Sequence, residues 1–374
     1  MYEQSDAKRL WNRRVRTLVP YVPGEQPREP NLVKLNTNEN PYPPAPGVQE
    51  AIRRFPIDRL RLYPDPASAD LRRSLAEYYG VSHEQIFVGN GSDEILAFAF
   101  QAFFNPLSAD SAPVDPSECI VFPDITYSFY PVYARMYDIP YREVPLDDRF
   151  RIQLQLMELP SAGIVLANPN APTGIPVDLE ALRRLAASDR NRLLLVDEAY
   201  IDFGGQSAVD LLPEFDNILI VQTLSKSRSL AGLRVGFAIG APALIDALER
   251  VRDSFNSYTL DRLAQVAAEA AFASSAWFEK TRAQIIATRE QTRAELAELG
   301  FLVLPSVANF LFVHHPARSG SELYQALRDR SILVRHFNRP RISDFLRVTI
   351  GTDQEMARLL TALRAILTPP METE

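Results

Sequence analysis

The chain has 374 residues, of which 46% are hydrophobic and 23% are charged, and its formal net charge is −7. These values predict a globular protein with a large core and more than one domain, and the interleaved charges argue against nucleic-acid binding. The first residues lack an apolar signal core, no segment reaches the roughly 18 consecutive apolar residues of a membrane helix, and Cys119 is the only cysteine. We therefore expect a cytoplasmic protein without a disulfide.

Residues 1–46 contain two proline-rich stretches, VPYVPGEQPREP (19–30) and NPYPPAP (40–46). Because proline restricts the backbone and cannot continue a helix, this part predicts an extended N-terminal arm. We expect the arm to join the smaller of two domains.

Short apolar runs alternate with helical patterns from residue 47 to about 245. The runs are IFVG (86–89), CIVF (119–122), GIVLAN (163–168), LLLVD (193–197), NILIV (217–221) and VGFAIG (235–240). This alternation predicts a large α/β domain with a mostly parallel sheet. Residues 246–374 begin with long helical patterns and end with the strand-like runs FLVLP, NFLFV and LRVTI, which predicts a smaller α+β domain.

The segment NGSDE (90–94) lies between an apolar run and a helical pattern, so Gly91, Ser92 and Asp93 should open a helix. A helix N-terminus is a natural phosphate site. The alternative for this segment is an ordinary N-cap.

Two further segments follow apolar runs. Tyr127 in PDITYSFY (123–130) either stacks on a flat heterocycle or belongs to the core. The turn NPNAPTG (168–174) offers Asn168 or Asn170 as a donor to a ring oxygen, although a turn needs no function.

The segments LLLVDEAY (193–200) and TLSKSRSLAGLRVGF (223–237) carry the main chemical signal. The first places Asp197 and Tyr200 at the end of a buried strand, where an acid is costly without a cation or donor. The second places Lys226 among phosphate-binding groups, namely Thr223, Ser225 and Arg234. An isolated lysine would be read as a surface residue, but pyridoxal phosphate needs a Schiff-base lysine, an acid at the ring nitrogen and phosphate donors together.

These motifs resemble fold-type I pyridoxal-phosphate aminotransferases, and among them the histidinol-phosphate aminotransferase family, over nearly the whole chain. The matching pieces are PYVPG (20–24), KLNTNENPYPPAP (34–46), YPDP (63–66), GNGSDE (89–94), TYSFY (126–130), NPNAPTG, VDEAY, TLSKSRSLAGLRVGF, VANF (307–310), ILVR (332–335) and LRVTIGT (346–352). The resemblance implies a large cofactor-binding domain and a smaller C-terminal domain.

The resemblance also implies roles for single residues. Lys226 forms the internal aldimine, Asp197 pairs with the ring nitrogen, Tyr200 binds the ring oxygen and Tyr127 stacks on the ring. The residues implied to bind the cofactor phosphate are Gly91, Ser92, Thr223, Ser225 and Arg234, with Asp93 beside them. The family often has a second asparagine where this chain has Ala171, which leaves the asparagine contact with the ring oxygen to Asn168 or Asn170.

By the same resemblance Tyr63 of YPDP reaches the cofactor phosphate of a partner subunit, which implies a homodimer. Arg347 matches a carboxylate-binding arginine and Arg335 matches an arginine that contacts substrate phosphate, with ion pairing as the simpler alternative for both. Tyr21 and Asn38 are the expected arm residues that close over the substrate.

The implied reaction is transfer of the amino group from histidinol phosphate to 2-oxoglutarate in histidine biosynthesis. The alternatives are an aromatic amino-acid transaminase and a threonine-phosphate decarboxylase. A non-catalytic ligand-binding protein on the same fold is disfavoured, because Lys226, Asp197, Tyr200 and Arg234 are all present. His314, His315 and His336 lack a metal-binding spacing, so we expect no metal.

Overall fold

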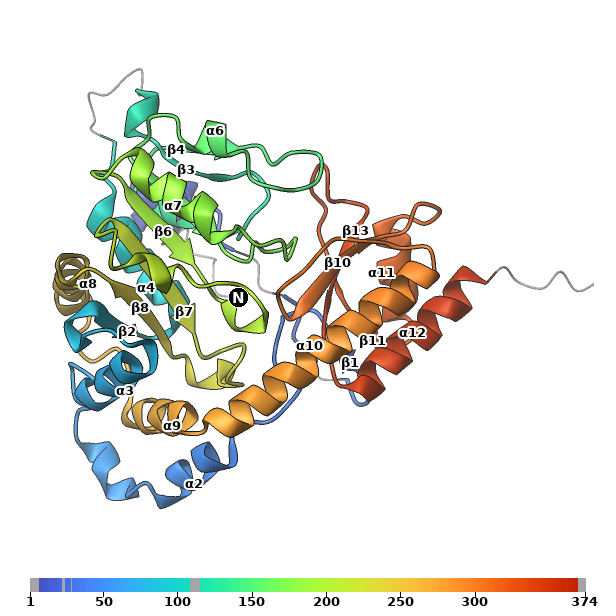
Figure 1. Ribbon diagram of the computed structural model, residues 1–374, viewed down its shortest axis with the longest axis horizontal. Coiled ribbons are helices and arrows are strands. Elements are labelled where there is room, and N and C mark those ends of the chain that lie inside the picture. The colour runs from blue at the N-terminus through green and yellow to red at the C-terminus, as the bar shows by residue number, and fades with distance from the viewer. Residues whose placement is uncertain (1–6, 22–23, 28, 108–114, 369–374) are drawn as a thin grey trace, which may run out of the picture.

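The computed structural model describes residues 7–21, 24–27, 29–107 and 115–368. Its largest sheet has seven strands in the order β2-β8-β7-β6-β5-β3-β4 (Figure 1). Neighbouring strands run parallel except at β8, which is antiparallel to both β2 and β7. The strands are β2 (Ile86–Gly89), β3 (Ile120–Pro123), β4 (Tyr141–Val144), β5 (Gly163–Ala167), β6 (Leu193–Asp197), β7 (Ile218–Thr223) and β8 (Gly236–Gly240). The predicted, mostly parallel sheet is confirmed.

Helices cover both faces of this sheet, which explains why its central strands are apolar throughout. Alternate residues of β5 enter opposite cores: Ile164 and Leu166 pack on one side, and Val165 and Ala167 pack on the other. The helices of this part are α2 (Pro46–Arg54), α3 (Ala69–Tyr79), α4 (Gly91–Phe103), α5 (Tyr130–Met136), α6 (Leu154–Met157), α7 (Leu179–Ser188), α8 (Pro242–Phe255) and α9 (Arg262–Ala273). Because both faces are covered, the ends of the strands are the places where polar side chains can face a cavity.

The edge strand β4 is absent from the predicted strands. Its sequence YREV contains two charged residues and forms no apolar run, and only Val144 of the four is buried. Strand β4 pairs with β3 alone, so one side of its backbone does not face another strand of the sheet.

A second, smaller unit is built on a four-stranded antiparallel sheet in the order β12-β13-β10-β9. Its strands are β9 (Leu302–Val303), β10 (Phe310–His314), β12 (Arg335–His336) and β13 (Phe345–Thr349). Its helices are α10 (Ser275–Glu298), α11 (Gly320–Arg328) and α12 (Asp353–Leu367). Figure 1 shows α10 running from the large unit to the small one.

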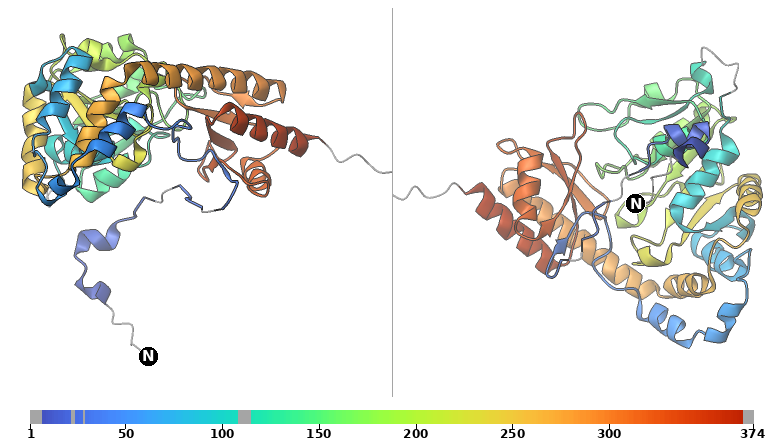
Figure 2. Two further views of the ribbon diagram at one scale, coloured as in Figure 1. Left: turned by 90° about the horizontal axis from the view of Figure 1, so that it is seen from below. Right: turned by 180° about the vertical axis from the view of Figure 1, so that it is seen from behind.

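The described part of the N-terminal arm begins with η1 (Ala7–Leu10) and α1 (Arg13–Thr17), which lie at the periphery of the molecule (Figure 2). Farther along, β1 (Val33–Lys34) pairs in parallel with β11 (Ile332–Leu333) of the small unit. Leu35 continues this contact, because its N–H donates to the carbonyl of Leu333 at 2.7 Å. These bonds support the expectation that the arm joins the smaller domain.

Helices α8 and α9 pack against the large sheet, so they belong to the large unit. Ile245 and Leu248 of α8 belong to one core of the large sheet, and Ala264 and Phe272 of α9 belong to the other. The helical pattern beyond residue 245 is also interrupted at Ser274, where α9 ends and α10 begins. We therefore propose a boundary near residue 274 in place of the expected boundary at 245.

Short 3-10 segments connect the remaining elements: η2 (Ile57–Arg61), η3 (His83–Gln85), η4 (Pro116–Glu118), η5 (Ile201–Phe203), η6 (Ala208–Leu211) and η7 (Ala231–Leu233).

Candidate active site

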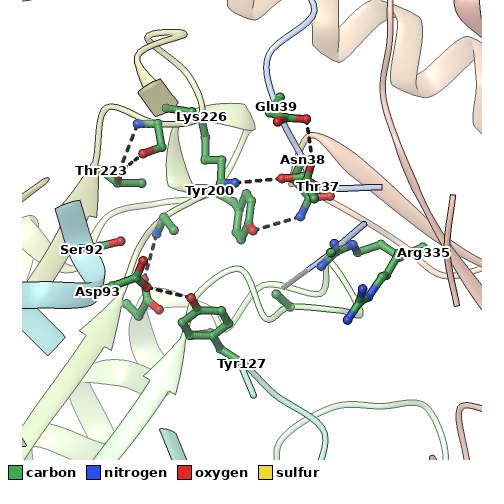
Figure 3. Close-up of a pocket in the computed structure, with 18 of the residues that line it drawn as sticks. Thr37, Asn38, Glu39, Ser92, Asp93, Tyr127, Tyr200, Thr223, Lys226 and Arg335 are labelled. Atoms are coloured by element: carbon green, nitrogen blue, oxygen red, sulfur yellow. Dashed lines mark hydrogen bonds between the residues drawn. The ribbon is translucent and has the colours of Figure 1, made fainter. Parts of the chain in front are cut away.

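A cavity of about 230 Å³ lies where the ends of the large sheet's strands meet the arm and the small unit. Its lining residues come from all three parts of the chain (Figure 3). They include Asn36, Thr37 and Asn38 of the arm, Asp197, Tyr200 and Lys226 of the large unit, and Arg335 and Arg347 of the small unit. The fold therefore gathers residues that are far apart in the sequence around one space.

Lys226 follows β7 and points toward the arm (Figure 3). Its Nζ donates a hydrogen bond to the carbonyl oxygen of Thr37 at 3.1 Å and lies 5.8 Å from the centre of the Tyr200 ring. The backbone beside it is held by the arm, because Asn40 Nδ2 donates to the carbonyl oxygens of Lys226 and Ser227 at 3.0 and 3.1 Å. The amine is thus placed in the cavity without a carboxylate salt-bridge partner among the described residues.

Asp197 ends strand β6 and is only 5% exposed. Tyr130 donates its hydroxyl proton to Asp197 Oδ2 at 2.9 Å, and the Ala199 N–H donates to Oδ1 at 3.3 Å. Burial nevertheless raises the pKa of Asp197 to about 6, although these two hydrogen bonds and Lys226 act in the opposite direction. A cationic ring nitrogen in the cavity would stabilise the ionised carboxylate.

The predicted phosphate residues meet at the start of α4. Ser92, Thr223, Ser225 and Arg234 line the same end of the cavity, and Arg234 Nη1 approaches Ser225 Oγ at 3.4 Å. Gly91 has φ +81°, and a Cβ at this position would lie 2.5 Å from Arg234 Nη2. Glycine therefore permits the guanidinium to lie against the helix N-terminus, whose free N–H groups attract anions.

Asp93, expected among the cofactor-binding residues, lines the cavity, and its side chain is hydrogen-bonded to two neighbours. Its Oδ1 accepts the hydroxyl proton of Tyr127 at 2.8 Å, and its Oδ2 accepts a hydrogen bond from Arg234 Nη2 at 3.2 Å. A carboxylate would repel a phosphate, whereas these two contacts orient a ring and a cation at the cavity wall. We infer that Asp93 positions Tyr127 and Arg234.

Neither predicted asparagine of NPNAPTG lines the cavity, whereas Ala171 does. Asn170 accepts from Thr126 Oγ1 and donates to the Ile125 carbonyl and Thr173 Oγ1, all at 2.9–3.0 Å. Asn168 Oδ1 accepts the Val177 N–H at 2.9 Å, and its Nδ2 is buried without a hydrogen-bond partner. The amide of Asn170 is therefore used within the protein, whereas Asn168 keeps an unpaired Nδ2 donor although it does not line the cavity.

Tyr200 packs its ring edge-on against Phe310 with the ring centres 5.1 Å apart. Its hydroxyl oxygen accepts a hydrogen bond from Asn38 Nδ2 at 3.0 Å (Figure 3). Asn38, which was expected to close over the substrate, is thus joined to Tyr200 within the protein.

The small unit contributes two arginines. Arg335 on β12 and Arg347 on β13 are register partners, so two like charges lie opposite each other on adjacent strands. Arg347 Nη2 donates to the Asn36 carbonyl at 2.8 Å, but its Nε is buried without a partner. Burial lowers the pKa of Arg347, and the neighbouring Arg335 lowers it further. Neither guanidinium has a carboxylate partner among the described residues, so ion pairing with these residues does not explain them.

The two remaining predicted tyrosines lie in different environments. Tyr21 of the arm lines the cavity and packs against Phe129, with the ring centres 4.2 Å apart. Tyr63 is 76% exposed, stacks on Tyr258 and does not line the cavity.

Three residues that contribute to the site were not singled out from the sequence: Thr37, Asn40 and Tyr130. All three belong to recognised motifs, NTNENP and TYSFY, but their contacts with Lys226 and Asp197 cross from one element to another. Among the residues with described placement, no group of His, Cys, Asp or Glu could hold a metal ion. None of the described helices is long and apolar enough to cross a membrane.

The family described as Aminotransferase class I and II matches residues 30–363. A histidinol-phosphate aminotransferase of Chromohalobacter salexigens is 54% identical over 358 residues, covering 96% of this chain and 99% of that protein. Histidinol-phosphate aminotransferase 1 of Methylococcus capsulatus is 56% identical over 357 residues, covering 96% of this chain and 97% of that protein.

Solved structures agree with the predicted fold. The crystal structure of histidinol-phosphate aminotransferase from Sinorhizobium meliloti in complex with pyridoxal-5'-phosphate has a TM-score of 0.80 at 25% identity, covering 89% of this chain and 90% of that chain. An aspartate aminotransferase of Thermus thermophilus has a TM-score of 0.77 at 23% identity, covering 96% of this chain and 99% of that chain, and shares the fold. The predicted fold-type I architecture is confirmed, and this chain belongs to the class I and II aminotransferase family.

Proposed function

We propose that this aminotransferase uses pyridoxal phosphate to transfer the amino group of histidinol phosphate to 2-oxoglutarate. The observation that carries the proposal is the pair of guanidiniums, Arg335 and Arg347, that line the cavity without a carboxylate partner among the described residues. Two adjacent, half-buried cations repel each other unless an anion binds between them. A dianionic substrate supplies that anion.

The residues of the cavity fit pyridoxal phosphate. Arg234, Ser92 and the N-terminus of α4 can hold a phosphate at one end, and Lys226 lies within the same space. Asp197 offers a carboxylate whose pKa, raised to about 6 by burial, would return toward its ordinary value beside a ring nitrogen carrying a proton. When bound, the cofactor supplies an electron-poor ring that accommodates the electrons released when a substrate carbon loses its proton.

The protein's own side chains then have separate roles in proton transfer and in holding the ring. Lys226 Nζ is the base that takes the proton from the substrate carbon and returns it, because it is the amine within the cavity. Asp197 keeps the ring nitrogen protonated, and Tyr130 holds this carboxylate in place through its 2.9 Å hydrogen bond. Tyr127, oriented by Asp93, covers the ring.

Both proposed substrates are dianions that must occupy the same cavity in turn. Histidinol phosphate carries a phosphate monoester, and 2-oxoglutarate carries two carboxylates. Guanidinium groups bind either kind of anion through paired N–H donors. Arg335 and Arg347 are therefore suited to both halves of a transamination.

The guanidinium pair also bears on the two alternative activities, because their substrates differ in the number of anionic groups. An aromatic amino acid has one carboxylate, which would leave one of the two arginines without an anion. Threonine phosphate carries a phosphate and a carboxylate, so the arginines do not separate the decarboxylase from the transaminase. The relatives that are 54% and 56% identical over nearly the whole chain are named histidinol-phosphate aminotransferases, which supports the transaminase.

The test is a titration of the purified holoenzyme with histidinol phosphate in the absence of a keto acid. We expect the visible band of the bound cofactor to be replaced by the band of pyridoxamine phosphate, because only the first half-reaction can proceed. Phenylalanine should cause the same change only at much higher concentration. Release of carbon dioxide from threonine phosphate, with no spectral response to histidinol phosphate, would replace the proposal by the decarboxylase.

The variant Arg335→Gln tests the role of the arginine pair in the same assay. We expect kcat/KM for histidinol phosphate to fall about 100-fold, the scale for loss of one buried charge partner, while the value for phenylalanine changes little. Replacement of the exposed Arg318 by glutamine is the control with the same change of charge. Equal losses for both substrates would show that Arg335 does not select the dianion.

We further propose that the enzyme is a homodimer in which Tyr63 completes the site of the partner. Tyr63 is 76% exposed, and Ile57, Leu60 and Phe255 are 68%, 48% and 74% exposed. Large apolar side chains with this exposure are typical of an interface between subunits. The expected cytoplasmic location stays a prediction.

Complementation between an inactive Lys226→Ala protein and a Tyr63→Ala protein with weakened cofactor binding tests the shared site. In a hybrid dimer of Lys226→Ala and Tyr63→Ala subunits, one site receives an intact Lys226 and an intact Tyr63. Tyr63→Ala alone should bind pyridoxal phosphate about ten-fold more weakly because a hydrogen bond to the phosphate is lost. At limiting cofactor, dissociating and reassociating the mixture should restore about a quarter of wild-type activity, since half of the dimers are hybrids with one intact site.

The control for complementation is the same mixture without dissociation, which should show only the summed activities of the two parents. If reassociated hybrids also show only that sum, Tyr63 acts within its own subunit or has no role at the site.

A further inference from the structure

Among the described residues, the hydroxyl group of Tyr200 has one hydrogen-bond partner, the side-chain amide of Asn38. The Tyr200 ring packs against an apolar cluster formed by Ala171, Ala308 and Phe310, and these side chains offer no hydrogen bond. The hydrogen bond from Asn38 Nδ2 to the Tyr200 oxygen is 3.0 Å long. Whatever Tyr200 does in the cavity therefore depends on how Asn38 holds this oxygen.

The amide of Asn38 is held in one orientation by Thr349. Thr349 Oγ1 accepts the backbone N–H of Asn38 at 3.0 Å and contacts Asn38 Oδ1 at 3.0 Å. Because Oγ1 already accepts one proton, its own proton is available for Oδ1, and this places the NH₂ group toward Tyr200. The reversed amide would leave the threonine proton without its acceptor.

Each polar atom of Asn38 has a hydrogen-bond partner in the protein. Its carbonyl oxygen accepts a hydrogen bond from Asn309 Nδ2 at 3.0 Å, so all four of its polar atoms have partners. Asn38 is 1% exposed. Its φ of +57° lies in the left-handed region, which asparagine adopts more readily than most other non-glycine residues. Asn38 is built into the protein as a connection between the arm, the small unit and Tyr200.

An amide NH₂ group can only donate, so the Tyr200 oxygen accepts from Asn38 and the Tyr200 proton must be directed elsewhere. The cavity wall beside Tyr200 includes Ala167, Ala171 and Ala199, whose side chains have no donor or acceptor. The cavity is therefore where a bound group can receive this proton.

We propose that Asn38 is a positioning residue that turns the O–H group of Tyr200 into the cavity, where Tyr200 is the side-chain donor to the ring oxygen of the cofactor. Ala171 offers no donor on this wall, Asn170 donates its amide to Ile125 and Thr173, and Asn168 does not line the cavity. The inference rests on the proposed function because it requires pyridoxal phosphate in the cavity. It assigns Asn38 to the cofactor through Tyr200 and not to the substrate.

The consequence is a measurable pKa of the bound cofactor. A donor to the ring oxygen stabilises its anionic form, so the cofactor attached to Lys226 loses its proton at lower pH. Loss of the donor should raise the apparent pKa, which is read from the visible absorption of the holoenzyme as a function of pH. This measurement needs no substrate and does not depend on turnover.

A double-mutant cycle with Asn38→Gly and Tyr200→Phe tests whether Asn38 acts on the cofactor through Tyr200. Glycine is chosen because it tolerates the positive φ of residue 38. We expect each single variant to raise the apparent pKa by about one unit, and we expect Asn38→Gly to add almost nothing in the Tyr200→Phe background. If the double variant shows the sum of the two single pKa shifts, Asn38 does not act through Tyr200 and this inference is overturned. The proposed function stays intact in that case, provided that the wild-type holoenzyme shows the cofactor absorption band.

Asn38→Asp is the second variant, because it keeps the size of the side chain. A carboxylate accepts the Tyr200 proton and turns it away from the cavity, so the apparent pKa should rise at least as far as in Asn38→Gly. An Asn38→Asp holoenzyme that titrates like the wild type would contradict the inference. A wild-type protein without a cofactor absorption band would overturn the proposed function and this inference together.

Discussion

Replacement of Lys226 by alanine should abolish transamination while the fold is retained. Within the described part of the chain, the Lys226 side chain makes one hydrogen bond, to the Thr37 carbonyl, and its loss should cost only about 1 kcal/mol of stability. Its amine is the proposed attachment point of the cofactor and the base at the substrate carbon, so the rate should fall by more than about 1,000-fold. Steady-state turnover with histidinol phosphate and 2-oxoglutarate measures the loss.

Lys226→Arg is the matched control for this variant. Arginine keeps the positive charge and a donor for Thr37, but its guanidinium stays protonated and cannot act as a base or attach to the cofactor. Both variants should still bind pyridoxal phosphate through Arg234 and the N-terminus of α4, without the absorption band of the lysine adduct. Turnover of either variant at the wild-type rate would remove Lys226 from the mechanism.

The second large effect is expected from Asp197→Asn. Asparagine has nearly the same shape and can still accept a hydrogen bond from Tyr130, but it cannot hold a proton on the ring nitrogen by charge. We expect kcat to fall about 100- to 1,000-fold, the scale for loss of one preorganised electrostatic contact. Cofactor binding and thermal stability, measured beside the rate, separate this effect from misfolding.

The pKa of Asp197 predicts how pH changes cofactor affinity. Burial raises this pKa to about 6 in the cofactor-free protein, so the carboxyl is protonated below pH 6 and ionised above it. Affinity for pyridoxal phosphate should therefore fall as pH decreases through about 6, because an uncharged carboxyl does not stabilise a cationic ring nitrogen. Asp197→Asn has no such titration, and comparison of the two proteins cancels the titration of the cofactor itself. Identical pH profiles would show that Asp197 does not pair with the ring.

The sequence alone predicted the residues that follow strands of the large sheet. Asp197 ends β6, Thr223 ends β7 and Lys226 follows it, and Gly91 opens α4 soon after β2. Parallel strands end at a common edge, so side chains placed just after successive strands converge without any knowledge of distant contacts. The buried apolar runs marked these strands because helices cover both faces of the sheet.

The sequence was less informative where polar residues have two possible directions. Asn170 lies in a turn beside the cavity, yet its hydrogen bonds to Ile125 and Thr173 direct its amide into the protein. Asp93 lies at a helix start, yet it orients Tyr127 and Arg234. Residue type and spacing do not determine the direction of a side chain, because that direction is decided by the partners that surround it.

By itself, the sequence determined the mostly parallel sheet, the arm, and the residues that follow the strand ends, since these depend on local composition and on the order of elements along the chain. The tertiary structure alone decided that Asn38 meets Tyr200, 162 residues away, and that Tyr130 holds Asp197. It also decided that Arg335 and Arg347 lie opposite each other, because the register between β12 and β13 places them there. Contacts of this kind depend on strand register and on the path of the arm across the small unit, which no local pattern encodes.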